Sequence, residues 1–293
     1  MTGDPITTTY KRLKIAASAA AGLKGPRVGF ELAQICEMSL DFIRDHADLS
    51  PLVSKVTDKQ YLMARLRTTF KSSRPINAGL FDPTINRSDI EQILHGSVDG
   101  LSAEVLQRHL YTTAISYLVA RDLVATDDKK SPATVFEMLI GHIVANKLGV
   151  NPTRSIAIPS LDIENTLPTD FIFDLGHGGL KIHMPVKIST RERVVQAWAH
   201  QRVLEGMHGA GRFLGIMVIL TETNKQKDTS VVEVCLPGQW AAYQMYISRM
   251  YRIYYFDLPK AYEPLRDRYP HIPVWPFAKF FTEYASIGQQ GAD

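Results

Sequence analysis

The sequence predicts an α/β protein of the α+β type, with a mixed central β-sheet flanked by helices and a helical N-terminal half. Apolar residues recur at helical spacing through most of residues 1–130. Short runs rich in β-branched and aromatic residues follow, with helical stretches before and among them. The polar residues 126–130 are the best candidate for a linker. We therefore expect two regions, residues 1–130 and residues 131–293.

Three helices are expected in the N-terminal half. The first follows Gly25-Pro26, and the second begins near Thr57 and is interrupted at Pro75. The third begins at about Ser102, a residue type that caps helix N-termini well. The apolar residues of each return every three or four positions, which predicts one buried face per helix.

The second half should open with a helix from Ser131 to about Gly149. Five runs then have the composition of strands: residues 155–158, 170–175, 180–188, 213–220 and 231–235. A helical stretch over residues 191–205 separates the third run from the fourth. The aromatic and proline-rich tail from residue 251 onward is expected to form short helices around the core.

Composition excludes several classes of protein. The net charge is only +3, so any nucleic-acid-binding charge has to be local. Residues 181–215 carry six basic and two acidic side chains, and residues 65–74 carry four basic and no acidic ones. The two cysteines, Cys36 and Cys235, are too few for a structural zinc cage. A disulfide framework is also unlikely with two distant cysteines, so we expect a cytoplasmic protein. No apolar run reaches the ~20 residues that span a bilayer, so we expect no membrane partner.

The most informative segment is a predicted hairpin with polar residues on one face. Strand alternation places Asp170 and Asp174 on one side of the first strand, and Lys181, His183, Pro185 and Lys187 on one side of the second. The glycine-rich residues 176–179 between the strands are typical of a tight turn. The hairpin should therefore bring one or two aspartates close to a lysine. A carboxylate that holds a divalent cation beside a lysine is suited to phosphodiester hydrolysis.

These residues resemble the active-site core of the PD-(D/E)xK nucleases, especially the type II restriction endonucleases. Pro168-Thr169-Asp170 would be the "PD" element with one residue inserted, and Pro185-Val186-Lys187 would be the "(D/E)xK" element. The resemblance covers about residues 131–235 and implies a restriction-endonuclease-like core. It also implies a sequence-specific endonuclease that cuts double-stranded DNA with Mg²⁺, or with Mn²⁺ as a substitute.

The resemblance assigns roles to individual residues. Asp170 would bind the metal, Lys187 would assist the attacking water, and the Val186 carbonyl would be a further metal ligand. This sequence departs from the pattern at Pro185, where the family has an acidic residue. Because some members move that carboxylate to a helix, Glu137 is the first candidate to complete the acidic set. Glu192 and Glu222 are weaker alternatives. Glu192 has the spacing of a capping box, which is a structural role at the start of a helix.

Basic and polar side chains near these motifs are candidates for DNA contacts. The candidates near Lys187 and in the basic N-terminal segment are Arg191, Arg193, Gln196, His200, Arg212, Arg74 and Lys71. Palindromic sites would make a homodimer natural, with the N-terminal region used for dimerisation or for gripping DNA.

Two alternatives remain open at this point. Pro185 also fits a non-catalytic DNA-binding or regulatory protein on a degenerate nuclease core. A small-molecule hydrolase with a metal held by His177, His183 and His200 is the other alternative, although their spacing matches no HExxH-type motif.

Overall fold

The structure is a computed structural model that describes residues 5–69, 71–125, 128, 130–158, 165–176, 180–190, 194–269 and 271–289. Contacts divide the chain into two compact units. The first unit comprises residues 1–146 and 223–234, and the second comprises residues 147–222 and 235–293. The division therefore differs from the one expected at residue 130. The helix after the polar linker counts with the first unit, and a short segment from the second half returns to it.

The first unit is built on helices with a small sheet. Its elements are α1 (Pro5–Ala17), α2 (Pro26–His46), β1 (Ala47–Leu52), β2 (Tyr61–Leu66), β3 (Ile76–Asn77), α3 (Arg87–Leu94), α4 (Ala103–Val124) and α5 (Ser131–Leu148). As expected, Pro26 stands in the first turn of α2 and Ser102 caps α4 by accepting a hydrogen bond from the Val105 amide. The central α4 is buried on most sides because α2 and α3 both pack against it.

The helix expected from Thr57 to Pro75 is wrong. Residues 61–66 form strand β2, which pairs antiparallel with β1 in a three-stranded sheet of order β1–β2–β3. Its burial does not alternate regularly, because Tyr61, Met63 and Ala64 are buried while Arg65 is exposed. The apolar spacing also fitted a helix, and pairing with β1 decided between the two.

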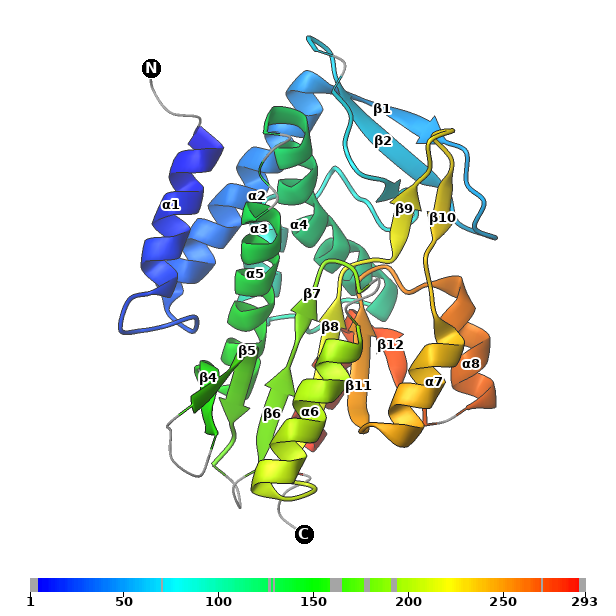
Figure 1. The fold of residues 1–293 in the computed structure, drawn as a ribbon. Helices are drawn as coiled ribbons and strands as arrows, with labels where there is room; N and C mark the ends of the chain where they lie inside the picture. The colour runs from blue at the N-terminus through cyan, green and yellow to red at the C-terminus, as the bar shows by residue number, and fades with distance from the viewer. Residues whose placement is uncertain are drawn as a thin grey trace. The chain divides into compact units, whose positions relative to one another are not determined.

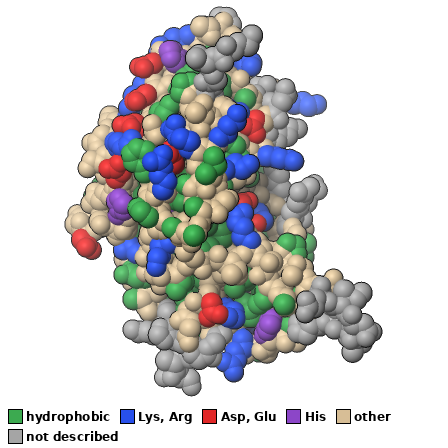
Figure 2. Space-filling model, turned by 90° about the vertical axis from the view of Figure 1, so that its left-hand side faces the viewer, with side chains coloured by type: hydrophobic (Ala, Val, Ile, Leu, Met, Phe, Trp, Pro, Cys, Tyr) green, Lys and Arg blue, Asp and Glu red, His purple; other side chains and the backbone are tan. Residues whose placement is uncertain are grey.

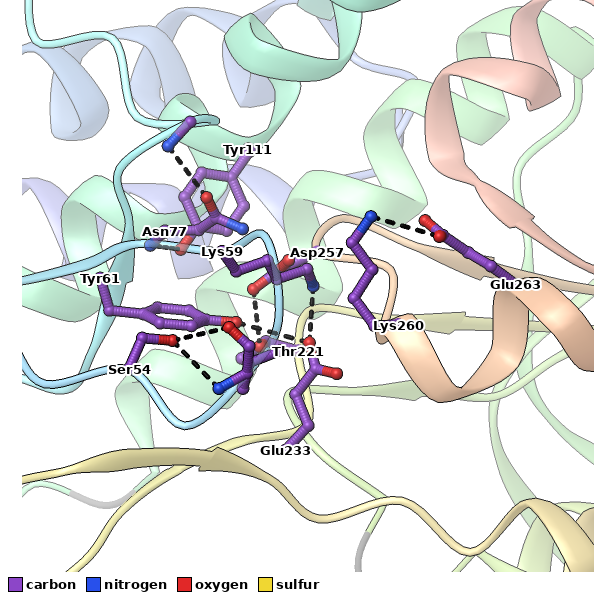
Figure 3. Close-up of polar contacts among 12 residues, drawn as sticks. Ser54, Lys59, Tyr61, Asn77, Tyr111, Thr221, Glu233, Asp257, Lys260 and Glu263 are labelled. Carbon is purple, nitrogen blue, oxygen red and sulfur yellow. Dashed lines mark hydrogen bonds and ion pairs between the residues drawn. The ribbon is translucent and has the colours of Figure 1, made fainter.

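A hairpin from far along the chain completes the first unit. Strands β9 (Thr223–Lys225) and β10 (Val231–Glu233) pair antiparallel as a separate two-stranded sheet. The expected strand over residues 231–235 therefore exists, but it is not part of the central sheet. Lys59 donates to Glu233 at 2.6 Å, and the hydroxyl of Tyr61 donates to the same carboxylate at 3.4 Å (Figure 3). A buried ion pair thus ties this hairpin to the segment that precedes β2.

The second unit contains the central mixed sheet (Figure 1). Its strands are β4 (Thr153–Ile158), β5 (Asn165–Asp174), β6 (Lys181–Met184), β7 (Val186–Lys187), β8 (Phe213–Ile219), β11 (Met250–Tyr255) and β12 (Val274–Pro276). The spatial order is β12–β11–β8–β6–β5–β4, and β7 pairs with β8. β4, β5 and β6 are antiparallel neighbours, whereas β6, β8, β11 and β12 run parallel. All but one residue of β8 is buried, as expected for a central strand covered on both faces.

Helices cover this sheet, and two of its strands come from the tail. Helix α6 (Val195–His208) connects β7 to β8, and α7 (Pro237–Tyr246) packs beside it on the same face (Figure 1). There Trp198 and Trp240 pack edge to face over buried residues of β8 and β11. The remaining helical elements are η2 (Lys260–Tyr262), α8 (Glu263–Arg268), η3 (Phe277–Lys279) and α9 (Phe280–Gln289). The expectation of a purely helical tail is therefore wrong, because β11 and β12 belong to the sheet.

Charges on the first unit are largely compensated within it. Basic and acidic side chains are interspersed over much of the face drawn in Figure 2. Arg87 pairs with Glu37 and Glu91, and Arg12 and Arg27 both pair with Glu31. Among the described residues, no helix combines the length and apolar composition needed to cross a membrane.

Candidate active site

The site is centred on the hairpin of β5 and β6, whose register is fixed by four residue pairs. Phe171 lies opposite Met184, and Asp174 lies opposite Lys181. The next position after the Phe171–Met184 pair would place Asp170 opposite Pro185. Proline has no N–H to give to a ladder, and it separates β6 from β7. The two strands therefore stop pairing where Asp170 and Lys187 face each other.

The carboxylate of Asp170 replaces the lost ladder hydrogen bonds. Its Oδ2 accepts the backbone N–H of Val186 at 2.8 Å and the ammonium of Lys187 at 2.7 Å. The Asp170 side chain is 21% exposed and that of Lys187 is 36% exposed, so the pair can be reached from solvent. Oδ1 of Asp170 has no hydrogen-bond partner within the described part of the chain. The hairpin expected from the sequence therefore brings the aspartate and the lysine into contact, and it leaves one carboxylate oxygen available.

The carbonyl of Val186 is directed toward the same side. The carbonyls of Pro185 and Lys187 both accept hydrogen bonds from β8, from Val218 N and Leu220 N. Because successive carbonyls of a strand point in opposite directions, that of Val186 points away from β8 and toward β5. Asp170 Oδ1 and this carbonyl are oxygen donors of the kind that Mg²⁺ prefers.

A cavity of about 260 Å³ opens over these groups. Its lining residues are Pro168, Thr169, Asp170, His183, Pro185, Lys187, Gln196, Ala197 and His200. The hydroxyl of Thr169 is buried and, among the described residues, lacks a hydrogen-bond partner. A buried polar atom without a partner is costly, so the cavity is suited to an ordered water or an ion.

His183 is the most deeply buried polar side chain in this lining. It is 1% exposed, and its Nδ1 lies 3.1 Å from Oε1 of Gln201. The amide nitrogen of Gln201 donates to the Phe213 carbonyl and to Glu205, so its oxygen faces His183 and Nδ1 carries the proton. Burial lowers the pKa of His183 to about 4. The imidazole is therefore neutral at neutral pH, with its lone pair on Nε2.

Gln196 and His200 reach the cavity from helix α6. Gln196 is exposed and His200 is half-buried. Burial lowers the pKa of His200, and the positive charge of Lys187 lowers it further. The rings of His183 and His200 are 6.3 Å apart, centroid to centroid. Gln196 and His200, two of the candidate DNA contacts named from the sequence, thus line the same cavity as Asp170 and Lys187.

The missing acidic residue is not replaced by Glu222. This carboxylate is 2% exposed and accepts hydrogen bonds from the amide and hydroxyl of Thr190 and from the hydroxyl of Tyr255. It fixes the segment that follows Lys187 and does not line the cavity. Glu137 is half-buried on α5, in the first unit, and its part in the site stays a prediction. Glu192 lies outside the described residues.

Several predicted DNA contacts lie elsewhere. Arg212 precedes β8 and is exposed, at the end where Lys181 pairs with Phe213. Lys187 pairs with Ile219 at the other end of that strand, roughly 20 Å away at about 3.3 Å per residue. Arg212 is therefore remote from the cavity within its own unit. A larger cavity, of about 700 Å³, lies at the Arg212 end of the sheet and includes Arg202 and Arg249 in its lining.

The two candidates in the first unit differ from each other. Arg74 forms a bidentate ion pair with Asp122, at 2.8 and 2.9 Å, so its charge is compensated. Lys71 is exposed in the segment that follows β2. Arg191 and Arg193 lie outside the described residues, as does His177 of the histidine-metal alternative.

The sequence indicated His183 as a member of a polar strand face and as one of three histidines in a possible metal site. Its pairing with Gln201 was not predicted, because the two residues are 18 positions apart and meet only when α6 packs on the sheet. Within the described residues, no group of three or more His, Cys, Asp or Glu side chains lies close enough together to hold a metal ion. Any cation here would therefore need backbone or water oxygens in addition to the side chains.

Comparison with known proteins identifies the fold. No family model matches the sequence, and no curated protein matches it. The solved structure of the type IIP restriction endonuclease Kpn2I matches with a TM-score of 0.81 and 22% identity, over 97% of this chain and 97% of that chain. A complex of restriction endonuclease PspGI with substrate DNA has a TM-score of 0.42 and 14% identity, over 67% of this chain and 81% of that one. The chain thus shares the fold of Kpn2I over almost its whole length, which confirms the restriction-endonuclease-like core predicted from the sequence.

Proposed function

We propose that the protein is a type II restriction endonuclease, which cuts double-stranded DNA at specific sites by metal-assisted hydrolysis. The observation that carries the proposal is the contact between Asp170 and Lys187 at the edge of a solvent-accessible cavity. Its support is that this contact occurs on the hairpin of a fold shared with a solved restriction endonuclease.

Asp170, Lys187 and Val186 divide the chemistry between them. Lys187 holds a positive charge next to the Asp170 carboxylate, where it can orient a water and neutralise charge that develops on the phosphoryl oxygens. Asp170 Oδ1 and the Val186 carbonyl would hold a divalent cation, Mg²⁺ or Mn²⁺. A cation bound there supplies Lewis-acid polarisation of the phosphodiester and acidifies a nearby water.

The partner follows from the chemistry. A site-specific nuclease acting on palindromic DNA needs one active site for each strand, so we include a homodimer in the proposal. Gln196 and His200 would contact DNA next to the cut, because they line the cavity from α6. Glu137, Arg191 and Arg193 remain candidates on the resemblance alone.

The test is cleavage of mixed plasmid DNA in the presence of Mg²⁺. We expect discrete fragments from the wild type and a loss of about 10²-fold or more in rate for Asp170→Ala and for Lys187→Ala, as is typical when a catalytic group is removed. Asp174→Ala is the matched control, since it breaks the other Asp–Lys pair of this hairpin, with Lys181, at the far end from the cavity. It should cleave at the wild-type rate.

Two outcomes would reject the proposal. DNA binding without cleavage in Mg²⁺ or Mn²⁺ would favour a non-catalytic relative, for which Pro185 is the supporting observation. Cleavage that survives both Asp170→Ala and Lys187→Ala would place the active site elsewhere.

A further inference from the structure

The cavity beside Asp170 contains a nitrogen donor that the proposed mechanism does not use. His183 lies opposite Ile172 on β5, and Asp170 is two residues from Ile172 on the same face of that strand. Such diagonal neighbours have Cβ atoms less than about 8 Å apart, which a cation can bridge through the two side chains. Both residues line the 260 Å³ cavity.

The imidazole of His183 is held as a metal ligand usually is. Metal-binding histidines donate their second ring N–H to a fixed acceptor, which sets the tautomer and the direction of the lone pair. Here Gln201 Oε1 is that acceptor, and Gln201 is itself fixed by the Phe213 carbonyl and by Glu205. Gln201 packs closely over the backbone of β8, because a Cβ on Gly215 would lie 3.0 Å from the Gln201 oxygen.

The remaining atoms of the site have capacity for a ligand. Nε2 of His183 and Oδ1 of Asp170 have no hydrogen-bond partner in the part of the chain that the structure describes. The buried Thr169 hydroxyl beside them also lacks one there. His142 offers a contrast in the first unit. It is equally buried, but its Nδ1 meets the Leu23 carbonyl and its Nε2 meets the Asn146 amide.

We propose that Nε2 of His183 is a metal ligand, which together with Oδ1 of Asp170 makes this a mixed nitrogen–oxygen site for divalent first-row transition ions. The inference deepens the proposed function, on which it rests. His183 supplies the protein ligand that Pro185, two residues further along the same strand face, cannot provide. An imidazole favours ions such as Co²⁺ and Zn²⁺, whereas Mg²⁺ prefers oxygen ligands throughout. The site should therefore bind Co²⁺ more tightly than Mg²⁺.

The test measures binding and does not depend on cleavage. Untagged protein without DNA is titrated with Co²⁺, followed by its visible d–d absorption, and Mg²⁺ is measured by competition. We expect His183→Gln to raise the Kd for Co²⁺ at least tenfold and to change that for Mg²⁺ little. Gln201→Leu should raise the Kd for Co²⁺ by about 10–100-fold, the usual effect of losing an outer-shell partner. Asp170→Ala should weaken the binding of both ions.

His142→Gln is the matched control, because it removes an equally buried histidine whose two ring nitrogens already have partners. It should bind Co²⁺ with the wild-type Kd. Unchanged Co²⁺ binding by His183→Gln, or no Co²⁺ binding by the wild type, would overturn the inference. If His183→Gln does not fold, imidazole ¹⁵N spectra of the wild type decide, since Co²⁺ on Nε2 must shift or broaden the His183 signal.

Failure of the two proposals can be told apart. A wild type that cleaves DNA with Mg²⁺ but binds no Co²⁺ at His183 would refute only the metal ligand. A wild type that binds Co²⁺ through His183 but cuts no DNA would refute only the nuclease.

Discussion

The ion pair between Lys59 and Glu233 should contribute strongly to the stability of the first unit. Its atoms are 2.6 Å apart, and the two side chains are only 9% and 8% exposed (Figure 3). The perturbation is Lys59→Met, which keeps most of the aliphatic length and removes the ammonium. The Glu233 carboxylate then loses its ion pair with Lys59.

The expected loss is large because the pair is shielded from water. Removing one partner of a buried pair typically costs about 3–5 kcal/mol, since it leaves a charge without compensation. The double variant Lys59→Met with Glu233→Leu should recover most of this, because a buried pair replaced by apolar residues is often neutral. A second pair, between Lys55 and Asp228, joins the same two segments at 3.0 Å but is exposed, and Lys55→Met should have little effect.

The assay is urea unfolding followed by far-UV circular dichroism and by hydrogen exchange of β9 and β10. Tryptophan fluorescence alone would not suffice, because Trp198, Trp240 and Trp275 all belong to the second unit. An equal loss for Lys59→Met and Lys55→Met would refute the argument from burial. A double variant no more stable than Lys59→Met would refute the argument from an uncompensated charge.

Three further predictions concern the second unit. Glu222→Gln should lower the free energy of unfolding by about 2–4 kcal/mol in urea titrations, because buried donors of Thr190 and Tyr255 lose a charged acceptor; an unchanged value would contradict this. Metal-free wild type should lose stability as the pH falls from 6.5 toward 4, by up to about 1.4 kcal/mol per unit. The reason is that the unfolded chain protonates His183 near pH 6.5 while the folded pKa is about 4. The pH dependence should be weaker in His183→Gln, and an identical slope would exclude the histidine as its cause. Gly215→Ala should cost about 1–3 kcal/mol by crowding Gln201 and Met250, whereas Gly206→Ala, in open space on α6, should gain about 0.4–1 kcal/mol. Thermal unfolding compares the two, and a stabilised Gly215→Ala would show that the strand accommodates the methyl group.

The hairpin at the centre of the site was predictable because its signals are local. Period-two alternation and a glycine-rich turn predicted one or two aspartates close to a lysine, and the resemblance to the nucleases singled out Asp170 and Lys187. Their contact at 2.7 Å agrees with this. The second contact, between Asp174 and Lys181, depends on the register of the hairpin, which the sequence did not fix.

The remaining elements depend on contacts that the sequence does not encode locally. β2 was assigned to a helix because its short apolar run fits both periods, and only its pairing with β1 decides between them. β11 was missed because its aromatic side chains pack on opposite faces of the sheet. Tyr255 packs on Trp240 and Tyr254 on Phe277. A strand buried on both faces shows no alternation to detect.

The site was incomplete in the sequence for the same reason. Gln201 orients His183 from 18 positions further along the chain, and Glu222 accepts a hydrogen bond from Thr190, 32 positions before it. Neither pair has a local signature. By contrast, Gln196 and His200 were named as candidates because they follow Lys187 closely in the sequence, and both line the cavity.

The discontinuous first unit has a consequence for synthesis on the ribosome. Its β9–β10 hairpin follows β4 to β8 in the chain. About 170 further residues are therefore synthesised after Lys59 before Glu233 is added. At roughly 5–20 residues per second, that delay is on the order of ten to thirty seconds. During this interval Lys59, which is buried in the folded protein, stays exposed. The first unit then has to remain soluble without its last two strands. Fragments that end before residue 223 should therefore be poor substitutes for the first unit, wherever else the chain is cut.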